Sequence, residues 1–217
     1  VIFIWSLIYF FIHYFERHRQ SEIEKLIWEA AVKDFELKTL KSQLNPHFMF
    51  NSLNSIRALI DENPQQAQGA VTQLSNLLRY TLQSEKKETV PLRDEIQAVS
   101  DYLALERIRY EERLDYKVDI HPDTNSIEIP PMMIQTLVEN AIKHGISRNT
   151  EGGFVLITST LDNNKLILNI KNSGTINKAD IASADGFGIK NTKQRLSLLY
   201  GTDASFVITN EPDNIVK

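Results

Sequence analysis

The stretch PPMMIQTLVENAIKHG, residues 130–145, decides how the C-terminal half of this sequence folds. Two prolines open the stretch and a glycine closes it, which is the usual punctuation of a helix. A strand-like alternation, LDYKVDI (114–120), comes before it. Two further strand-like runs follow, GGFVLITSTL (152–161) and KLILNIKNSG (165–174), separated by turn residues.

The rest of the C-terminal half adds a helix and a strand. DGFGIKNTKQRLSLLYG (185–201) reads as a glycine-bearing loop that opens a helix ending at Gly201, and SFVITN (205–210) reads as a strand. Strands and helices in this order predict an α/β sandwich, in which one sheet carries helices over one face.

Polar residues gather on the helix of residues 130–145. At α-helical spacing Asn140, Lys143 and His144 occupy neighbouring positions of one face, and Glu139 adjoins them. Amide and carboxylate oxygens suit Mg²⁺, and an ammonium suits a polyphosphate. An ordinary amphipathic helix with a solvated face explains these residues equally well when they are taken alone.

The loop DGFGIKN (185–191) favours the nucleotide interpretation. Gly186 and Gly188 allow the backbone to approach a ligand closely, and the helix that begins near Ile189 offers free N–H groups to phosphate. Three basic residues follow, Lys190, Lys193 and Arg195. Together with the helix of residues 130–145, the loop predicts a nucleotide site.

Composition narrows the class of protein. The chain has 217 residues, enough for two compact units, and a formal net charge of -4 without a clustered basic surface. This disfavours nucleic acid as a direct partner. Because cysteine is absent, disulfides, thiolate nucleophiles and zinc-thiolate sites are excluded.

Residues 1–20 predict a membrane attachment. Residues 1–15 carry no Asp, Glu, Lys or Arg, and the basic flank ERHRQ contains Arg17 and Arg19. The run is shorter than the roughly 20 residues that span a bilayer. We interpret it as the end of a transmembrane helix, with the following residues on the cytoplasmic side of the inner membrane. A buried helix is the alternative.

Residues 21–44 predict a long helix with a heptad-like seam. Ile23, Ala30, Leu37 and Leu44 occupy one seam position, whereas Leu26 and Leu40 occupy the other. This indicates a short parallel coiled coil that leads from the membrane into the next segment. A helix packed once against a globular neighbour is the alternative.

The segment LNPHF contains a proline within a helical pattern. Pro46 is expected to bend or loosen the helix, with Asn45 capping a restarted helix. Projection of residues 46–60 at 100° per residue separates two faces. One face carries Met49, Leu53, Ile56 and Ile60, and the opposite face carries His47, Asn51, Asn54 and Ala58.

The next two helices complete a predicted helical unit. A turn at DENPQQ leads to a helix over about 67–84, with Val71, Leu74, Leu78 and Leu82 on one side. Two apolar stripes in one hairpin predict dimerisation into a four-helix bundle. The third helix has Leu92, Ile96, Val99 and Leu103 on one side and is expected to cover the following domain.

Four segments in order resemble those of a known family. LVENAIKHG resembles the N box, NSGT the first glycine box and GFGIKNTKQRL the second glycine box of the GHKL ATPase fold. LKSQLNPHFMFNSLNSI resembles the phosphoacceptor motif of LytS/YehU-type sensor histidine kinases. The implied fold is α + α/β, with a dimeric helical hairpin (45–88) before a linker helix and a GHKL (Bergerat) α/β sandwich (89–217).

The resemblance implies an inner-membrane homodimer that phosphorylates His47 from Mg-ATP. The phosphoryl group would then pass to an aspartate of a response regulator, commonly one with a LytTR domain. Asn140 would bind Mg²⁺, Glu139 would assist the metal or polarise the acceptor, and Asn51 would orient the His47 ring or hold a water for dephosphorylation. An exposed Asn51 without a role is the alternative. The implied nucleotide-binding residues are Asn140, Lys143, His144, Asn172, Gly174, Gly186, Gly188, Asn191 and Arg195.

Some positions depart from the family pattern. Asn172 and Ile176 stand where the first glycine box normally has an aspartate and a glycine, and Phe48 stands where many histidine kinases have an acidic residue. We hypothesise that Asn172 weakens selection of adenine, because a flipped amide donates to a guanine carbonyl. The family's last strand is also missing from the sequence. A non-catalytic dimeric scaffold is the alternative function.

Overall fold

The computed structural model describes residues 45–84, 87–147, 149–176 and 187–217. The chain divides into a unit of residues Val1–His47 and a unit of residues Phe48–Lys217. The predicted transmembrane segment (1–20) and coiled coil (21–44) lie outside the described residues. Within the described ranges, every helix is too short or too polar to cross a membrane.

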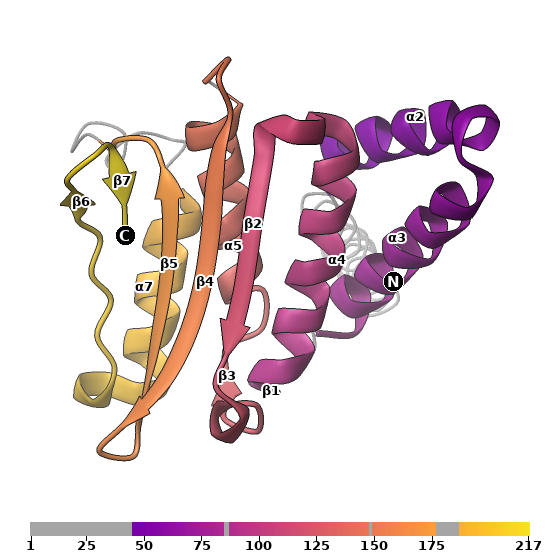
Figure 1. Cartoon of the computed structure of the whole chain (residues 1–217). Coiled ribbons are helices and arrows are strands. Elements are labelled where there is room, and N and C mark those ends of the chain that lie inside the picture. The colour runs from indigo at the N-terminus through magenta and orange to yellow at the C-terminus, as the bar shows by residue number, and fades with distance from the viewer. Residues whose placement is uncertain (1–44, 85–86, 148, 177–186) are drawn as a thin grey trace, which may run out of the picture. The chain divides into compact units, whose positions relative to one another are not determined.

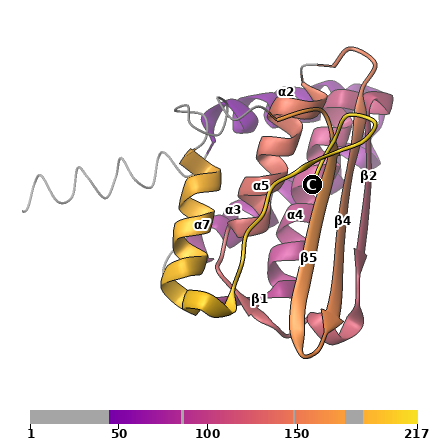
Figure 2. The ribbon, with the colours of Figure 1, turned by 90° about the vertical axis from the view of Figure 1, so that its left-hand side faces the viewer.

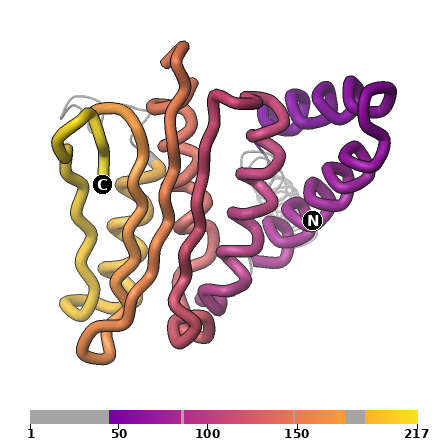
Figure 3. Tube along the Cα trace, viewed as in Figure 1, coloured from indigo at the N-terminus to yellow at the C-terminus, as the bar shows by residue number. Residues whose placement is uncertain are grey.

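Three helices, with the short strand β1 (Val90–Pro91) between the second and the third, form the first part of the described chain, in the order that Figure 3 traces. They are α2 (Pro46–Glu62), α3 (Pro64–Ser84) and α4 (Leu92–Tyr110). Pro46 and Pro64 occupy first helical positions, where the missing N–H costs nothing. The side chain of Asn63 accepts a hydrogen bond from the backbone N–H of Gln66 (3.2 Å), so α3 begins three residues before the predicted Ala67.

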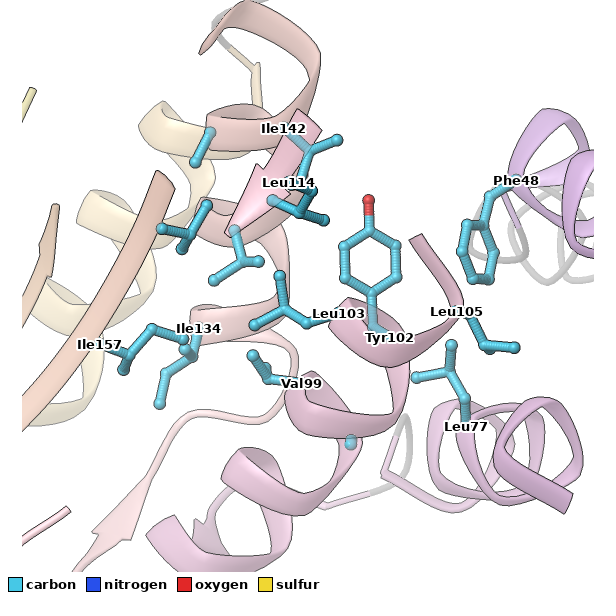
Figure 4. Packing of buried hydrophobic residues seen from close by; sticks show 14 of the residues in the cluster. Phe48, Leu77, Val99, Tyr102, Leu103, Leu105, Leu114, Ile134, Ile142 and Ile157 are labelled. Atoms are coloured by element: carbon cyan, nitrogen blue, oxygen red, sulfur yellow. The ribbon is translucent and has the colours of Figure 1, made fainter. Parts of the chain in front are cut away.

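The apolar residues predicted for one face of α2 and of α3 are only partly buried in the single chain. On α2, Phe48, Ser52 and Ile56 are buried, whereas Leu53 and Ile60 are 50% and 55% exposed. The helix turns this way because the Phe48 ring packs on Tyr102 of α4, with ring centroids 4.9 Å apart (Figure 4). On α3, Leu74 and Leu77 are buried, but Val71 and Leu82 are exposed.

A five-stranded sheet has the order β2-β4-β5-β7-β6, as Figure 1 shows. Strand β2 (Leu114–Ile120) is parallel to β4 (Gly153–Asp162), and the other pairs are antiparallel. The remaining strands of the sheet are β5 (Lys165–Ser173), β6 (Asn210–Glu211) and β7 (Ile215–Val216). A second, small sheet pairs β1 (Val90–Pro91) with β3 (Glu128–Ile129).

Helices α4, α5 (Met133–Ala141) and α7 (Phe187–Tyr200) lie over one face of the five-stranded sheet (Figure 2). Buried Val99 and Leu103 of α4 meet Ile134 of α5 and Ile157 of β4 in one hydrophobic core (Figure 4). The mixed α + α/β class and the one-sided arrangement of the helices are confirmed. Short 3₁₀ turns occur at Glu111–Arg113, Pro122–Thr124 and Gly201–Asp203.

The predicted strand at SFVITN (205–210) is wrong. Residues 204–209 form no strand, and β6 begins only at Asn210. Alternation of apolar residues makes a strand only where a neighbouring strand pairs with it, and the described part of β5 pairs on this side with β7 and not with residues 204–209. Thr209 instead exchanges two backbone hydrogen bonds with Lys217 (2.8 and 2.9 Å).

Candidate functional site

Helix α5 presents one apolar and one polar side. Ile134, Val138 and Ala141 are buried beneath it, whereas Glu139 and Asn140 are half-buried. The helix begins directly after Met132, whose φ of 62° is left-handed and whose side chain makes no cap hydrogen bond. The buried apolar residues of this helix recur at the α-helical period.

The predicted α-helix does not continue through Lys143 and His144. Residues Ile142–Ile146 form a π turn, in which the Ser147 N–H donates to the Ile142 carbonyl (2.9 Å). The grouping of Asn140, Lys143 and His144 at α-helical spacing is therefore corrected: Lys143 is exposed and His144 is partly buried. Single π turns inside helices are frequent at functional sites.

Gly145 explains why the helix changes here. A Cβ at this position would lie 2.2 Å from the Ser173 carbonyl oxygen and 3.0 Å from Nδ2 of Asn172. The backbone of the π turn therefore packs directly on the end of β5, which only glycine permits. In the sequence Gly145 is recognisable only as the residue that ends the predicted helix. Its contact with the end of β5 has no local signal in the sequence.

The first glycine box lies at the end of β5. Asn172 is buried, and its Nδ2 donates to the Ser173 carbonyl (2.9 Å). The N–H of Gly174 donates to the Asn214 carbonyl (2.7 Å). Ile176 exchanges two hydrogen bonds with the side chain of Asn210 (2.9 and 3.0 Å). These contacts bring the C-terminal hairpin against the end of β5.

Gly188 brings α7 against the polar side of α5. A Cβ at Gly188 would lie 2.7 Å from Cγ2 of Thr136 and 3.2 Å from Nδ2 of Asn140. The second glycine box and the N box are therefore adjacent. Gly186 lies outside the described residues, so its place in the nucleotide site remains a prediction.

Arg195 and Asn191 lie further along α7. Nη1 of Arg195 donates to the Pro131 carbonyl (3.0 Å), which fastens α7 to the residues before α5. Asn191 is exposed. A pocket between α5 and α7 is lined by Pro130, Pro131, Met132, Met133, Thr136, Gly188, Asn191, Thr192 and Arg195.

Two glutamates lie near each other, Glu139 on α5 and Glu106 on α4. Glu139 accepts a hydrogen bond from Nε2 of Gln135 (3.0 Å), and burial raises the pKa of its carboxyl group. Burial also raises the pKa of Glu106 on α4; Glu139 adds repulsion, whereas Arg109 at 3.6 Å and the Tyr102 hydroxyl oppose the rise. The sequence analysis missed Glu106, although a glutamate at an inward position of a helix is a usable signal.

Comparison with known proteins assigns the family. The family described as histidine kinase matches residues 35–114. The chain is 36% identical over 185 residues to sensor protein LytS of Staphylococcus haemolyticus, covering 80% of this chain and 32% of that protein. It is 34% identical over 189 residues to sensor histidine kinase BtsS of Escherichia coli K12, covering 87% of this chain and 33% of that protein.

The chain belongs to the LytS-type sensor histidine kinases. It spans about a third of the length of these curated relatives. A solved histidine kinase domain, from a blue-light activated histidine kinase of Erythrobacter litoralis, is 16% identical, with a TM-score of 0.46. That comparison covers 83% of this chain and 90% of the solved one.

The predicted phosphoacceptor histidine lies at the start of α2. His47 is the second residue of the helix and is exposed, and Asn51 lies one turn later and is half-buried. Phe48, in the place of an acidic residue, is buried against Tyr102. The departure from the family pattern thus gives the helix its anchor in the core.

Asn140, the predicted magnesium ligand, has a side-chain atom that the described part of the fold leaves without a partner. In the described part of the chain, Nδ2 of Asn140 is buried without a hydrogen-bond partner, which marks a polar side chain not committed to the fold. The same ranges contain no group of three His, Asp or Glu side chains that would hold a metal by itself. Mg²⁺ commonly binds through one or two protein oxygens, water and substrate phosphates.

Proposed function

We propose that this chain is the catalytic part of a membrane-bound, two-component sensor histidine kinase. It transfers the γ-phosphoryl group of Mg-ATP to His47 and then to an aspartate of a response regulator. The observation that carries the proposal is the packing of Gly188 against Thr136 and Asn140, which joins the two nucleotide-binding motifs in a chain of this family.

The proposed domain order follows the family. Residues 1–20 end a transmembrane helix, 21–44 form a signalling coiled coil, 45–88 form the phosphoacceptor hairpin, and 89–217 form the linker helix and the GHKL domain. Exposed Leu53, Ile60, Val71 and Leu82 on α2 and α3 support a homodimer with a four-helix bundle. A LytTR-type regulator is the proposed partner.

The proposed reaction needs few reactive groups. The neutral imidazole of His47 attacks the γ-phosphorus, the bond to the β-γ bridging oxygen breaks, and ADP leaves. Bound Mg²⁺ neutralises the charge of the phosphate oxygens. The carboxamide oxygen of Asn140 is the proposed ligand of the ion, and Lys143 and His144 are the proposed phosphate contacts. Positioning therefore supplies most of the rate.

Glu139 is the proposed acid-base group. Its raised pKa, caused by burial, equips it to share a proton with the acceptor imidazole as the phosphoryl group arrives. Asn172 is the proposed acceptor for the adenine amino group. Gly174, Gly186, Asn191 and Arg195 complete the proposed nucleotide site.

The test is incubation of the chain with γ-labelled ATP and Mg²⁺. We expect acid-labile, alkali-stable label on the wild type, no label on His47→Gln, and wild-type label on His121→Gln, a matched change at a half-exposed turn. Asn140→Ala should lose the label and the binding of Mg-ATP together. Absence of label from the wild type would favour a non-catalytic dimeric scaffold.

A further inference from the structure

Glu95 is a fully buried carboxylate that the proposed reaction does not use. It lies in the first turn of α4 and has 0% exposure. A glutamate is almost never fully buried without partners, because removing its charge from water is costly. Glu95 is therefore expected to have specific hydrogen-bond partners.

One carboxylate group connects three helices. Oε2 of Glu95 accepts hydrogen bonds from the backbone N–H of Met132 (2.8 Å) and from the hydroxyl group of Tyr80 on α3. Oε1 accepts one from the backbone N–H of Gln135 (3.1 Å). The hydrogen bonds of Glu95 thus link α3 and α4 directly to the beginning of α5.

Glu95 supplies the cap that α5 lacks. The first N–H groups of a helix have no partner within the helix, and a Ser, Thr, Asp or Asn just before it usually accepts from them. Met132 occupies that position in α5 and makes no side-chain cap bond. Glu95 accepts from Gln135, the third residue of α5, and so caps the helix from α4.

Burial and hydrogen bonding act in opposite directions on the Glu95 carboxyl group. Burial raises the pKa of Glu95, and the bonds from Tyr80, Gln135 and Met132 oppose this rise by stabilising the carboxylate. A negative charge at a helix N-terminus is also favoured by the helix dipole. Loss of the Tyr80 bond would weaken one side of this arrangement while leaving the two backbone bonds in place.

We propose that Glu95 and Tyr80 are a positioning pair that couples the dimerisation helix α3 to the nucleotide-binding helix α5. The proposal rests on the proposed function, because it takes Asn140 of α5 as part of a nucleotide site. Coupling of this kind is reciprocal: if the position of α3 changes nucleotide affinity, nucleotide binding changes the state of α3 to the same extent in free energy.

Hydrogen exchange of the full chain, with and without Mg²⁺ and a non-hydrolysable ATP analogue, tests the coupling. We expect the analogue to change amide exchange in the second half of α3 in the wild type. Tyr80→Phe should at least halve that change, while its affinity for the analogue stays within about twofold, since the cap remains. Tyr200→Phe, which removes a hydroxyl bonded to the Glu128 carbonyl, should keep the wild-type response.

Glu95→Gln provides the second arm. It preserves shape but replaces one acceptor oxygen with a donor, so we expect about tenfold weaker analogue binding and loss of the α3 response. Asp94→Asn, on the same turn, should leave both unchanged. An undiminished α3 response in Tyr80→Phe would overturn the coupling.

The wild type separates the two proposals. If it binds the analogue and becomes phosphorylated on His47 without any change in α3, the coupling is wrong and the proposed function stands. If it binds no nucleotide and takes no label, the proposed function fails, and the inference that rests on it fails with it.

Discussion

At the scale of single residues, Asn172, which stands where the family pattern has an aspartate, has the clearest consequence for nucleotide selection. Its Nδ2 donates to the Ser173 carbonyl, and a flipped amide would place Oδ1 against that oxygen instead. The contact therefore disfavours the donor orientation on which weakened adenine selection depends. It leaves Oδ1 as the atom of this side chain suited to accept from an adenine amino group.

We accordingly expect ATP to be preferred over GTP, with a modest affinity. Asn172→Leu removes the amide acceptor and should abolish the preference for ATP, because a methyl group accepts no hydrogen bond. Competition of each nucleotide against a fluorescent ATP analogue measures both effects. Equal competition by GTP and ATP in the wild type would revive the flipped-amide hypothesis.

Glu139 gives a prediction about pH. Burial raises its pKa in the folded protein above the value in the unfolded chain, which is about 4.3. Below that value the carboxyl group is protonated in both states. As the pH rises, the unfolded chain loses its proton first, so the free energy of unfolding falls until the pH passes the raised pKa.

Glu139→Gln removes the fall in the free energy of unfolding that deprotonation of Glu139 causes. The melting temperature of the variant should exceed that of the wild type by a margin that grows as the pH rises from about 4 towards the raised pKa of Glu139. Glu112→Gln, which also removes one carboxylate but at an exposed position, serves as the control for the change in charge. A constant margin for Glu139→Gln would contradict the prediction.

At the scale of elements, the π turn and the end of β5 depend on Gly145. The Cβ of an alanine at this position would overlap the Ser173 carbonyl oxygen, a backbone atom that cannot turn away. We expect Gly145→Ala to lower the free energy of unfolding by about 1–3 kcal/mol, the usual cost of overpacking. Chemical denaturation provides the measurement.

Gly69→Ala on α3 is the matched control. A Cβ there would meet no atom within 4 Å, and alanine is favoured over glycine inside a helix. This variant should be more stable than the wild type by roughly 0.5–1 kcal/mol. Equal effects of the two substitutions would show that the contact with Ser173 is unimportant.

The elements also show what could be predicted from the sequence. Helices α3 and α4 and strands β2, β4 and β5 follow from local periodicity, and the structure confirms them within a few residues. The inward face of α2 could not be predicted, because Phe48 is turned inward by Tyr102, far along the chain. The cap by Glu95 and the close packing of Gly145 likewise could not be predicted, because each depends on a backbone group far along the chain, the Gln135 N–H and the Ser173 carbonyl.

At the scale of the whole molecule, the helical hairpin exposes apolar side chains that a single chain does not cover. Leu53 and Ile60 on α2 and Val71 and Leu82 on α3 are each between 45% and 55% exposed. Burial of the exposed half of one such side chain contributes about 1 kcal/mol, half the value for a fully exposed one, and a two-fold interface counts each of them twice. The proposed dimer gives these side chains a partner.

We expect the chain in detergent to sediment as a dimer and the double variant Leu53→Lys/Val71→Lys to sediment as a monomer. Because both positions are already exposed in the single chain, the fold of each protomer should survive, as circular dichroism would show. Leu161→Lys, at another exposed leucine on β4, should leave the dimer intact. A double variant that remains dimeric would place the interface elsewhere, and the four-helix bundle would then be the wrong arrangement for this kinase.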